Sequence, residues 1–278
     1  MSAPPPDPEP LTGPIFDAHT HLDAMAHRAG VPADDRFVAE AMARARRVGV
    51  HAVITVGDTV ESSRWCVAAA QNHPDVWAAV AVHPTEVRGM SDEDYAELER
   101  LARHPKVVAV GETGLDNYWD RTTPGEQQEH FRRHIDLAKR VGRPLMIHDR
   151  EAHSDILQIL GDEGAPETVV FHAFSGDAAM ARDCAASGYV LSYPGVLTFT
   201  NAPAVREAFL ATPVEQILVE TDAPFLTPHP YRGRPNAPYL LPFTLRRAAA
   251  ELEIDDGELA ARIRATGRRT FGPEMCSG

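Results

Sequence analysis

The 278-residue sequence predicts an α/β fold and, within that class, a (β/α)8 barrel, the TIM barrel. Short apolar runs alternate with amphipathic segments along the chain, which is the pattern of a parallel sheet covered by helices. Eight such pairs occupy about 260 residues, a usual size for this barrel. A doubly wound open sheet, which shows the same alternation, is the structural alternative.

The predicted elements follow in order from these two periodicities. The expected strands, each an apolar run, span 15–22, 52–57, 77–82, 107–111, 144–148, 168–174, 189–193 and 217–222. The expected helices span 35–48, 60–72, 92–103, 124–141, 151–160, 177–187, 202–211, 242–251 and 256–266. Pro74 and Pro105 end the helices before them, because proline cannot continue a helix. His83 precedes a proline but follows a strand, which places it at the rim where barrel enzymes carry their chemistry.

Composition favours one large domain. Hydrophobic residues make up 44% of the chain, and no stretch approaches the roughly 20 apolar residues of a membrane span. We expect a Pro-rich, disordered lead-in over residues 1–14, a single barrel domain over 15–272 and a frayed tail over 273–278. The first residues lack the features of a signal peptide and the three cysteines are far apart, so we expect a cytoplasmic protein.

The charge of the chain limits how it could bind nucleic acid. The formal net charge is −13, whereas proteins that bind nucleic acid through their surface are usually basic. Any nucleic-acid substrate must therefore be held by local arginines and metal ions rather than by a global positive field.

Histidines and carboxylates stand at the ends of five predicted strands. The carboxyl ends of barrel strands meet at one end of the barrel, so we expect these side chains to converge there. His19 and His21 share one face of their strand and can chelate one metal ion. Asp17 shares that face but lies deeper, where it can orient a ligand. The remaining strand-end residues are Glu112, His148, His172 and Asp222.

Imidazole and carboxylate ligands together suit zinc, manganese, iron or, less well, magnesium. Two divalent ions about 3.5–4 Å apart form the usual hydrolytic clamp, and such a pair needs a bridging anion. Some metallohydrolases use a carboxylated lysine, but neither lysine of this chain ends a strand, so Glu112 is the bridging candidate. His130 and His134 lie on a charged helix without a metalloprotease motif, and we expect both to be solvated.

At these residues the sequence resembles the TatD family of metal-dependent hydrolases, within the amidohydrolase superfamily of barrels. The resemblance runs from about residue 15 to 239 and covers the motifs DAHTHLD at 17–23, VHP at 82–84, GETGLD at 111–116, IH at 147–148, HAFSG at 172–176, ETDAP at 220–224 and RGRPN at 232–236. It implies a TIM barrel of the metal-dependent hydrolase type. Family members are described as metal-dependent deoxyribonucleases, several of them 3′–5′ exonucleases.

The resemblance also implies a ligand set for two divalent ions, with zinc, manganese, magnesium or iron as the candidates. One ion is held by His19, His21, Glu112 and Asp222, and the second by Glu112, His148 and His172. Departures from the family pattern at Asn117, Ala173 and Ala237 remove no ligand. Those at Asn117 and Ala237 lie at the expected mouth and bear on substrate preference.

The expected reaction is attack on phosphorus by a hydroxide that bridges the metals. Asp222 can orient the attacking water and accept its proton. Glu220 faces the same way, one layer deeper, where it can support the site or ligate a displaced metal. His83 can donate to the phosphate or leaving oxygen, or merely cap the turn before its proline.

The expected substrate is DNA or another phosphodiester, as single strands or ends. Arg150, Arg232 and Arg234 lie in loops after strands and are candidate phosphate clamps, although each alone could be a solvated surface arginine.

Two other functions are compatible with the sequence. The same site could attack the carbonyl of a C–N or carboxylic ester bond, as elsewhere in the amidohydrolase superfamily. The barrel could also be a non-catalytic metal-binding scaffold, although degenerate enzymes lose ligands and all six are present here.

Overall fold

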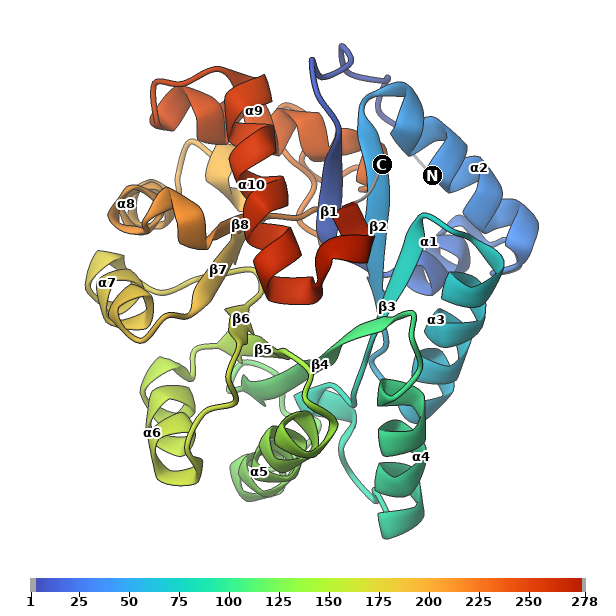
Figure 1. Ribbon diagram of the computed structural model, residues 1–278, viewed down its shortest axis with the longest axis vertical. Helices are drawn as coiled ribbons and strands as arrows, with labels where there is room; N and C mark the ends of the chain where they lie inside the picture. The colour runs from blue at the N-terminus through green and yellow to red at the C-terminus, as the bar shows by residue number, and fades with distance from the viewer. Residues whose placement is uncertain (1–3, 277–278) are drawn as a thin grey trace.

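The computed structural model describes residues 4–276, and in it eight parallel strands form one sheet in the order β1 to β8 (Figure 1). Each strand pairs in parallel with the next along the chain, as a (β/α)8 barrel requires and an open doubly wound sheet does not. The strands are β1 Ile15–Thr20, β2 Val50–Val56, β3 Val76–Val80, β4 Val107–Asp116, β5 Leu145–Arg150, β6 Val169–Phe171, β7 Val190–Tyr193 and β8 Ile217–Val219.

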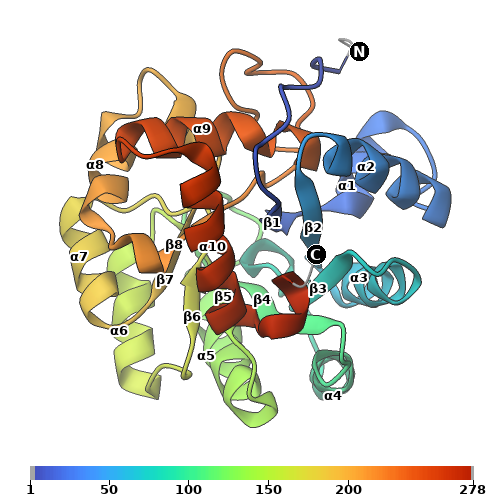
Figure 2. The same cartoon turned by 45° about the horizontal axis from the view of Figure 1, so that its top comes forward.

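The first and last strands close the barrel through a single bridge. Thr20 pairs in parallel with Ala223, which lies just beyond β8. Helix α10 (Asp256–Phe271) packs against both β1 and β8 at this seam (Figure 2), and its Phe271 ring meets Phe16 edge-on at 6.4 Å. The helix thus covers a seam that the strands alone leave weakly paired.

Several helices begin where the sequence supplies capping side chains. Asp34, Thr59, Ser91, Thr123 and Asp177 each accept a hydrogen bond from a backbone N–H of the first turn that follows. The remaining helices are α1 Leu22–Ala29, α2 Asp35–Arg47, α3 Val60–Asn72, α4 Asp92–Ala102, α5 Pro124–Val141, α6 His153–Glu163, α7 Ala178–Ala186, α8 Pro203–Ala211 and α9 Leu241–Glu251.

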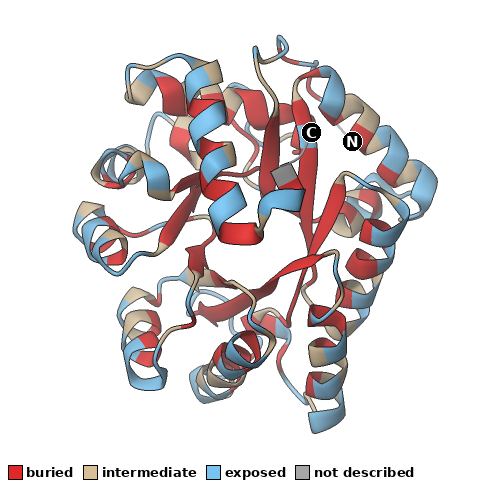
Figure 3. Cartoon of the chain, in the orientation of Figure 1, coloured by how far each residue is buried: buried red, intermediate tan, exposed pale blue. Residues whose placement is uncertain are grey.

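The core lies along the strands and beneath the inner faces of the helices. Figure 3 shows buried strands inside a ring of helices whose outer faces are exposed. All ten residues of β4 are buried, and this strand runs five residues beyond the predicted end at 111. Strands β6 and β8 instead stop early, so His172 and Asp222 lie in the connections just past them.

Residues 4–14 contain no helix or strand, yet they lie against the barrel rather than free of it. The Tyr239 hydroxyl donates to the carbonyl of Pro5 at 2.8 Å, Arg44 pairs with Asp7 at 2.6 Å, and Arg246 donates to the carbonyl of Pro10 at 3.0 Å. These contacts give an extended, docked segment where we expected a disordered lead-in. Residues 1–3 of that lead-in lie outside the described residues.

The expected frayed tail begins as a short 3-10 helix, Pro273–Cys276, in which Met275 is buried; residues 277–278 lie outside the described part. No helix within residues 4–276 is both long and apolar enough to span a membrane.

The expectation that His130 and His134 are solvated is wrong. Both are buried. The Tyr95 hydroxyl forms a hydrogen bond with Nδ1 of His130, and the Val82 N–H donates to Nε2 of His134. The charged residues of α5 occupy its other face, so the composition of the helix concealed its buried pair.

Candidate metal centre

The strand-end histidines and carboxylates predicted from the sequence meet at the C-terminal end of the barrel. They come from β1, β4 and β5 and from the connections after β6 and β8. His19, His21, Glu112, His172 and Asp222 are buried, whereas His148 is partly exposed. Groups of their nitrogen and oxygen atoms lie within 4.8 Å of one another, close enough to share a metal ion.

The first cluster consists of His19, His21, Asp222 and one oxygen of Glu112. The two histidine Nε2 atoms are 3.1 Å apart, and they lie 3.5 Å and 3.3 Å from Glu112 Oε1. They lie 3.8 Å and 3.5 Å from Asp222 Oδ1. Ligand atoms around a tetrahedral zinc ion stand about 3.3–3.6 Å apart, so the His19, His21 and Glu112 atoms can share a divalent ion, with Asp222 beside the two imidazoles.

The second cluster uses the other oxygen of the same glutamate. Glu112 Oε2 lies 3.1 Å from His148 Nδ1 and 2.8 Å from His172 Nε2, and those two nitrogens are 3.3 Å apart. The two carboxylate oxygens of Glu112 therefore face different sets of imidazoles. This is the arrangement that a carboxylate bridging two cations needs.

Two glycines of β4 allow the strand to approach β5 this closely. A Cβ on Gly111 would lie 2.4 Å from the Cβ of Met146. One on Gly114, whose φ is +143°, would lie 2.1 Å from the carbonyl oxygen of His148. Any other residue at either position would push β5 away, and His148 with it.

Hydrogen-bond acceptors orient two of the clustered histidines, and a third lies beside a carboxylate. His148 Nε2 lies 3.0 Å from Asp116 Oδ2, and His172 Nδ1 lies 3.3 Å from Glu220 Oε1. His21 Nδ1 lies 3.0 Å from the carbonyl of Val56. The contacts of His148 and His21 each hold one ring nitrogen and leave the other directed at the cluster, the usual arrangement behind metal-ligating histidines. His172 Nδ1 lies at ion-pair distance from Glu220 but makes no hydrogen bond.

Asp17 and Glu220 serve as supports in this geometry. Asp17 accepts from the N–H of Thr221 at 2.8 Å and from the N–H of His19 at 3.3 Å, so it ties β1 to the connection after β8. Glu220 Oε1 accepts from the N–H of Ala173 at 2.7 Å, and its other oxygen is buried without a partner. Neither carboxylate belongs to a metal-compatible group within residues 4–276.

The buried charges at this end depend on one another. Burial opposes ionisation of Glu112, but the neighbouring imidazoles of His172 and His19 hold its pKa well below the usual range. Burial also opposes protonation of His172, yet the Glu112 carboxylate raises its pKa well above normal. Burial raises the pKa of Asp58, beside His21, to about 7. The cluster thus gains stability from positive charge, which a divalent cation supplies.

His83 caps the turn before its proline and also lies beside the second cluster. Its Nδ1 accepts from the N–H of Thr85 at 3.2 Å and so caps the short turn Pro84–Glu86. Its ring also lies 4.4 Å from that of His148, which places it at the edge of the second cluster. The cap fixes the ring without occupying Nε2.

The three arginines predicted as phosphate clamps lie in different settings. Arg150 stacks over the ring of Tyr118 at 3.9 Å, and its main chain pairs with Asp116 and Asn117 beside the second cluster. Arg232 stacks over Phe199 and reaches Asn201. Arg234 donates to the carbonyl of Pro4 in the docked lead-in. Arg150 is therefore the arginine placed most directly at the centre.

Three exposed aromatic residues at the same rim were missed in the sequence: Tyr118, Trp119 and Phe225. Asp58 beside His21 was missed as well. Their positions in the sequence were the available signal, because Tyr118 and Trp119 stand two and three residues after Asp116 and Asp58 directly follows a predicted strand.

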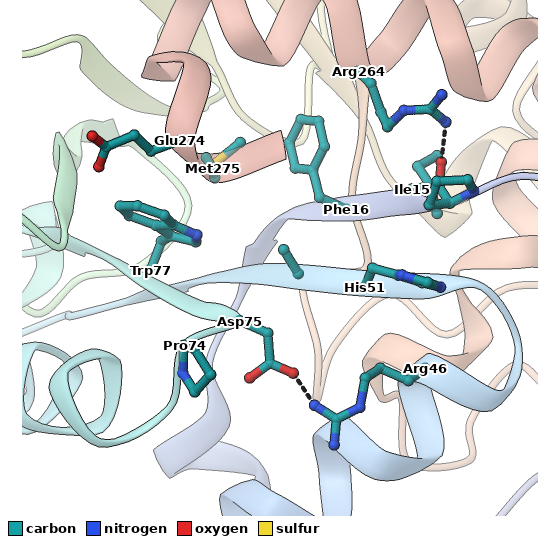
Figure 4. A pocket seen from close by; sticks show the side chains of 12 residues that line it. Ile15, Phe16, Arg46, His51, Pro74, Asp75, Trp77, Arg264, Glu274 and Met275 are labelled. Carbon is teal, nitrogen blue, oxygen red and sulfur yellow. Dashed lines mark hydrogen bonds and ion pairs between the residues drawn. The ribbon is translucent and has the colours of Figure 1, made fainter. Parts of the chain in front are cut away.

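A cavity of about 370 Å³ lies at the opposite end of the barrel, near the starts of β1, β2 and β3 (Figure 4). Its lining includes Phe16, Trp77 and the ion pair between Arg46 and Asp75. None of the metal-compatible groups found within residues 4–276 includes a residue of this cavity. Barrel enzymes carry their chemistry at the other end, so the cavity is not the candidate site.

Comparison with known proteins gives a consistent family relationship. The family model described as TatD related DNase matches residues 16–272. A Mycobacterium tuberculosis protein named "uncharacterized metal-dependent hydrolase TatD" is 51% identical, with 93% of this chain and 98% of that protein covered. An Erwinia tasmaniensis protein named "3'-5' ssDNA/RNA exonuclease TatD" is 34% identical, covering 82% and 91%. The crystal structure of YJJV, a TatD homologue from Escherichia coli, superposes with a TM-score of 0.85 at 27% identity, covering 93% and 98%.

Proposed function

This chain belongs to the TatD family of metal-dependent hydrolases, and from that premise we propose that it hydrolyses phosphodiester bonds of DNA as a 3′–5′ exonuclease-like enzyme. The observation that carries the proposal is the placement of Glu112, whose two carboxylate oxygens face two separate ligand clusters. Relatives named 3'-5' ssDNA/RNA exonucleases at 34% identity support the same reaction and favour single strands or ends as substrates.

In this proposal His19, His21, Glu112 and Asp222 would hold the first ion, and Glu112, His148 and His172 would hold the second. The mixture of imidazole and carboxylate fits zinc, manganese or iron better than magnesium. When bound, such a pair lowers the pKa of a water molecule and neutralises charge on the phosphoryl oxygens.

The side chains of the protein then position the water and the phosphate. Asp222 lies at the open side of the first cluster, where its carboxylate can orient the attacking water and accept its proton. The Thr85 N–H occupies Nδ1 of His83, so the neutral ring carries its proton on Nε2 and can donate it in a hydrogen bond to the phosphate or leaving oxygen. Arg150 supplies charged donors at the mouth, while Arg232 and Arg234 stand farther out as secondary clamps.

The test is a side-by-side assay of the metal-loaded protein on a single-stranded oligonucleotide, a simple phosphodiester and an acyl ester. We expect cleavage of both phosphodiesters, release of mononucleotides from the 3′ end, and loss of activity by a factor of about 10³ or more in Asp222→Ala. Circular dichroism should show that this variant stays folded.

Two results would overturn the proposal. Faster hydrolysis of the acyl ester than of either phosphodiester would favour the amidohydrolase-type reaction on C–N or ester bonds. Bound metal without turnover of any of the three substrates would favour the non-catalytic metal-binding scaffold.

A further inference from the structure

The mouth of the barrel carries three exposed aromatic side chains, Tyr118, Trp119 and Phe225. We propose that they form two base-stacking platforms, one beside each ligand cluster, which hold unpaired nucleotides on the two sides of the scissile phosphate. This inference rests on the proposed phosphodiesterase function and narrows its substrate to nucleic acid whose bases are unpaired near the cleaved bond.

The exposure of these side chains requires an explanation. Tyr118, Trp119 and Phe225 are 52%, 50% and 49% exposed, and the only other large hydrophobic residues of residues 4–276 so exposed are Val31 and Leu210. Three of the five such residues thus stand in the two loops that follow β4 and β8, next to the metal-compatible clusters. An exposed apolar group beside a functional site indicates contact with a ligand.

The β4 platform, Tyr118 with Trp119, is fixed to the second cluster through one carboxylate. Asp116 Oδ1 accepts from the backbone N–H of Tyr118 and of Trp119, at 2.9 Å in each case. Its other oxygen lies 3.0 Å from His148 Nε2. The side chain that orients a candidate metal ligand therefore also sets the position of the two rings.

The β8 platform, Phe225, is fixed to the first cluster in a similar way. Its ring lies 6.1 Å from that of His21, edge to face, and its N–H donates to the carbonyl of Asp222. Asn236, which is buried, donates to the carbonyl of Phe225 at 2.6 Å. Both platforms thus stand on loops held by hydrogen bonds, so little ordering is needed when a base arrives.

Arg150 adds a charge for the backbone between the stacked bases. Its guanidinium lies 3.9 Å from the centre of the Tyr118 ring, and it forms no ion pair with the described residues. A guanidinium stacked in this way keeps its N–H donors available for phosphate oxygens. Arg121 also faces Trp119, but it is paired with Glu86 at 2.8 Å.

Stacking resolves the conflict between a nucleic-acid substrate and a net charge of −13. Binding of duplex DNA depends on many phosphate contacts, which this surface does not offer. Every unpaired base presents a π-face, and aromatic platforms bind single strands without selecting sequence. Paired bases are already stacked on their neighbours and cannot reach the platforms.

The experiment compares the double variant Tyr118→Ala/Trp119→Ala, the single variant Phe225→Ala and the control Leu210→Ala, which removes an equally exposed side chain near the end of α8. The substrates are an oligothymidylate, the same oligonucleotide with abasic residues at its 3′ end, and methyl p-nitrophenyl phosphate. The measured quantity is the ratio of kcat/KM for the oligonucleotide to kcat/KM for the small ester.

We expect this ratio to fall roughly 10-fold to 100-fold in the double variant, less in Phe225→Ala, and to stay unchanged in the control. The wild-type protein should discriminate against the abasic oligonucleotide, and the double variant should not. An unchanged ratio, or equal loss on the normal and abasic oligonucleotides, would overturn the inference.

A binding measurement separates this inference from the proposed reaction. If the wild-type protein cleaved no phosphodiester, the proposed function would fail, but fluorescence polarisation with labelled oligothymidylate in EDTA would still test the platforms. Weaker binding by the double variant than by Leu210→Ala would support them, and equal binding would refute them.

Discussion

The two ends of the barrel differ in the partners of their charged side chains. At the N-terminal end, Arg46 pairs with Asp75 and the Lys106 ammonium lies near three backbone carbonyls, so these cations have partners within the protein. At the C-terminal end, Glu112 and Asp222 are buried, and their ion-pair partners among residues 4–276 are histidines, not arginine or lysine. The first end is complete without a ligand, whereas the second is built to receive cations.

This difference in charge pairing separates the cavity at the N-terminal end from the candidate metal site at the C-terminal end. The cavity at the N-terminal end has a volume of about 370 Å³, but its lining holds no member of the metal-compatible groups found within residues 4–276. The cluster at the C-terminal end is compact, yet its donor atoms converge from five different strands or connections. The charge balance therefore identifies the functional end better than the volume does.

Removal of metal from the C-terminal end should cause the largest change in activity and stability. Dialysis against a strong chelator should abolish hydrolysis and lower the free energy of unfolding by about 5–8 kcal/mol, the sum for two ions that each saturate their site 100-fold to 1,000-fold. The measurements are an activity assay and thermal unfolding with and without added zinc or manganese. A protein whose activity and unfolding temperature ignored the chelator would contradict the account.

A smaller loss of activity or metal affinity is expected when Asp116, whose carboxylate orients His148, is replaced. Asp116→Asn keeps an oxygen that can accept from the N–H groups of Tyr118 and Trp119, but it places an amide NH2 where Oδ2 meets His148. We expect activity or metal affinity to fall about 10-fold to 100-fold, because the ring loses the acceptor that orients it. Metal titration of the variant checks this, and wild-type affinity would show that Asp116 acts only on its loop.

The smallest change in stability and activity should come from a substitution at the N-terminal end of the barrel. Asp75→Asn breaks the pair with Arg46, whose side chain is half exposed, so the free energy of unfolding should fall by no more than about 1 kcal/mol. Hydrolysis and metal content should equal those of the wild type. A large loss of activity in this variant would show that the two ends are coupled and would weaken the contrast between them.

The sequence predicted the barrel and the convergence of its charged residues because both follow from periodicity and phase. Every predicted strand is present, and Glu112, His148 and Asp222 meet although they lie far apart in the chain. What escaped prediction depends on tertiary contacts. Helix α1, which has no capping side chain, was missed because its first residue was assigned to the strand predicted over 15–22.

Three further features escaped prediction because they also depend on contacts between parts of the chain that are distant in sequence. The burial of His134 follows from packing of α5 against the backbone at Val82, which no local pattern encodes. The docking of residues 4–14 depends on Arg44 and Tyr239, both distant in sequence. The exposed rings of Tyr118 and Trp119 became informative only when their loop was placed beside the second cluster.

The most direct test of the central claim, that Glu112 bridges two ions, is the metal content of the wild-type protein and of Glu112→Gln, measured by mass spectrometry after loading with zinc or manganese. The account predicts two ions per chain in the wild type. The variant should hold fewer, because an amide cannot offer a charged oxygen to both clusters. Two tightly held ions in Glu112→Gln, or a single ion in the wild type, would contradict it.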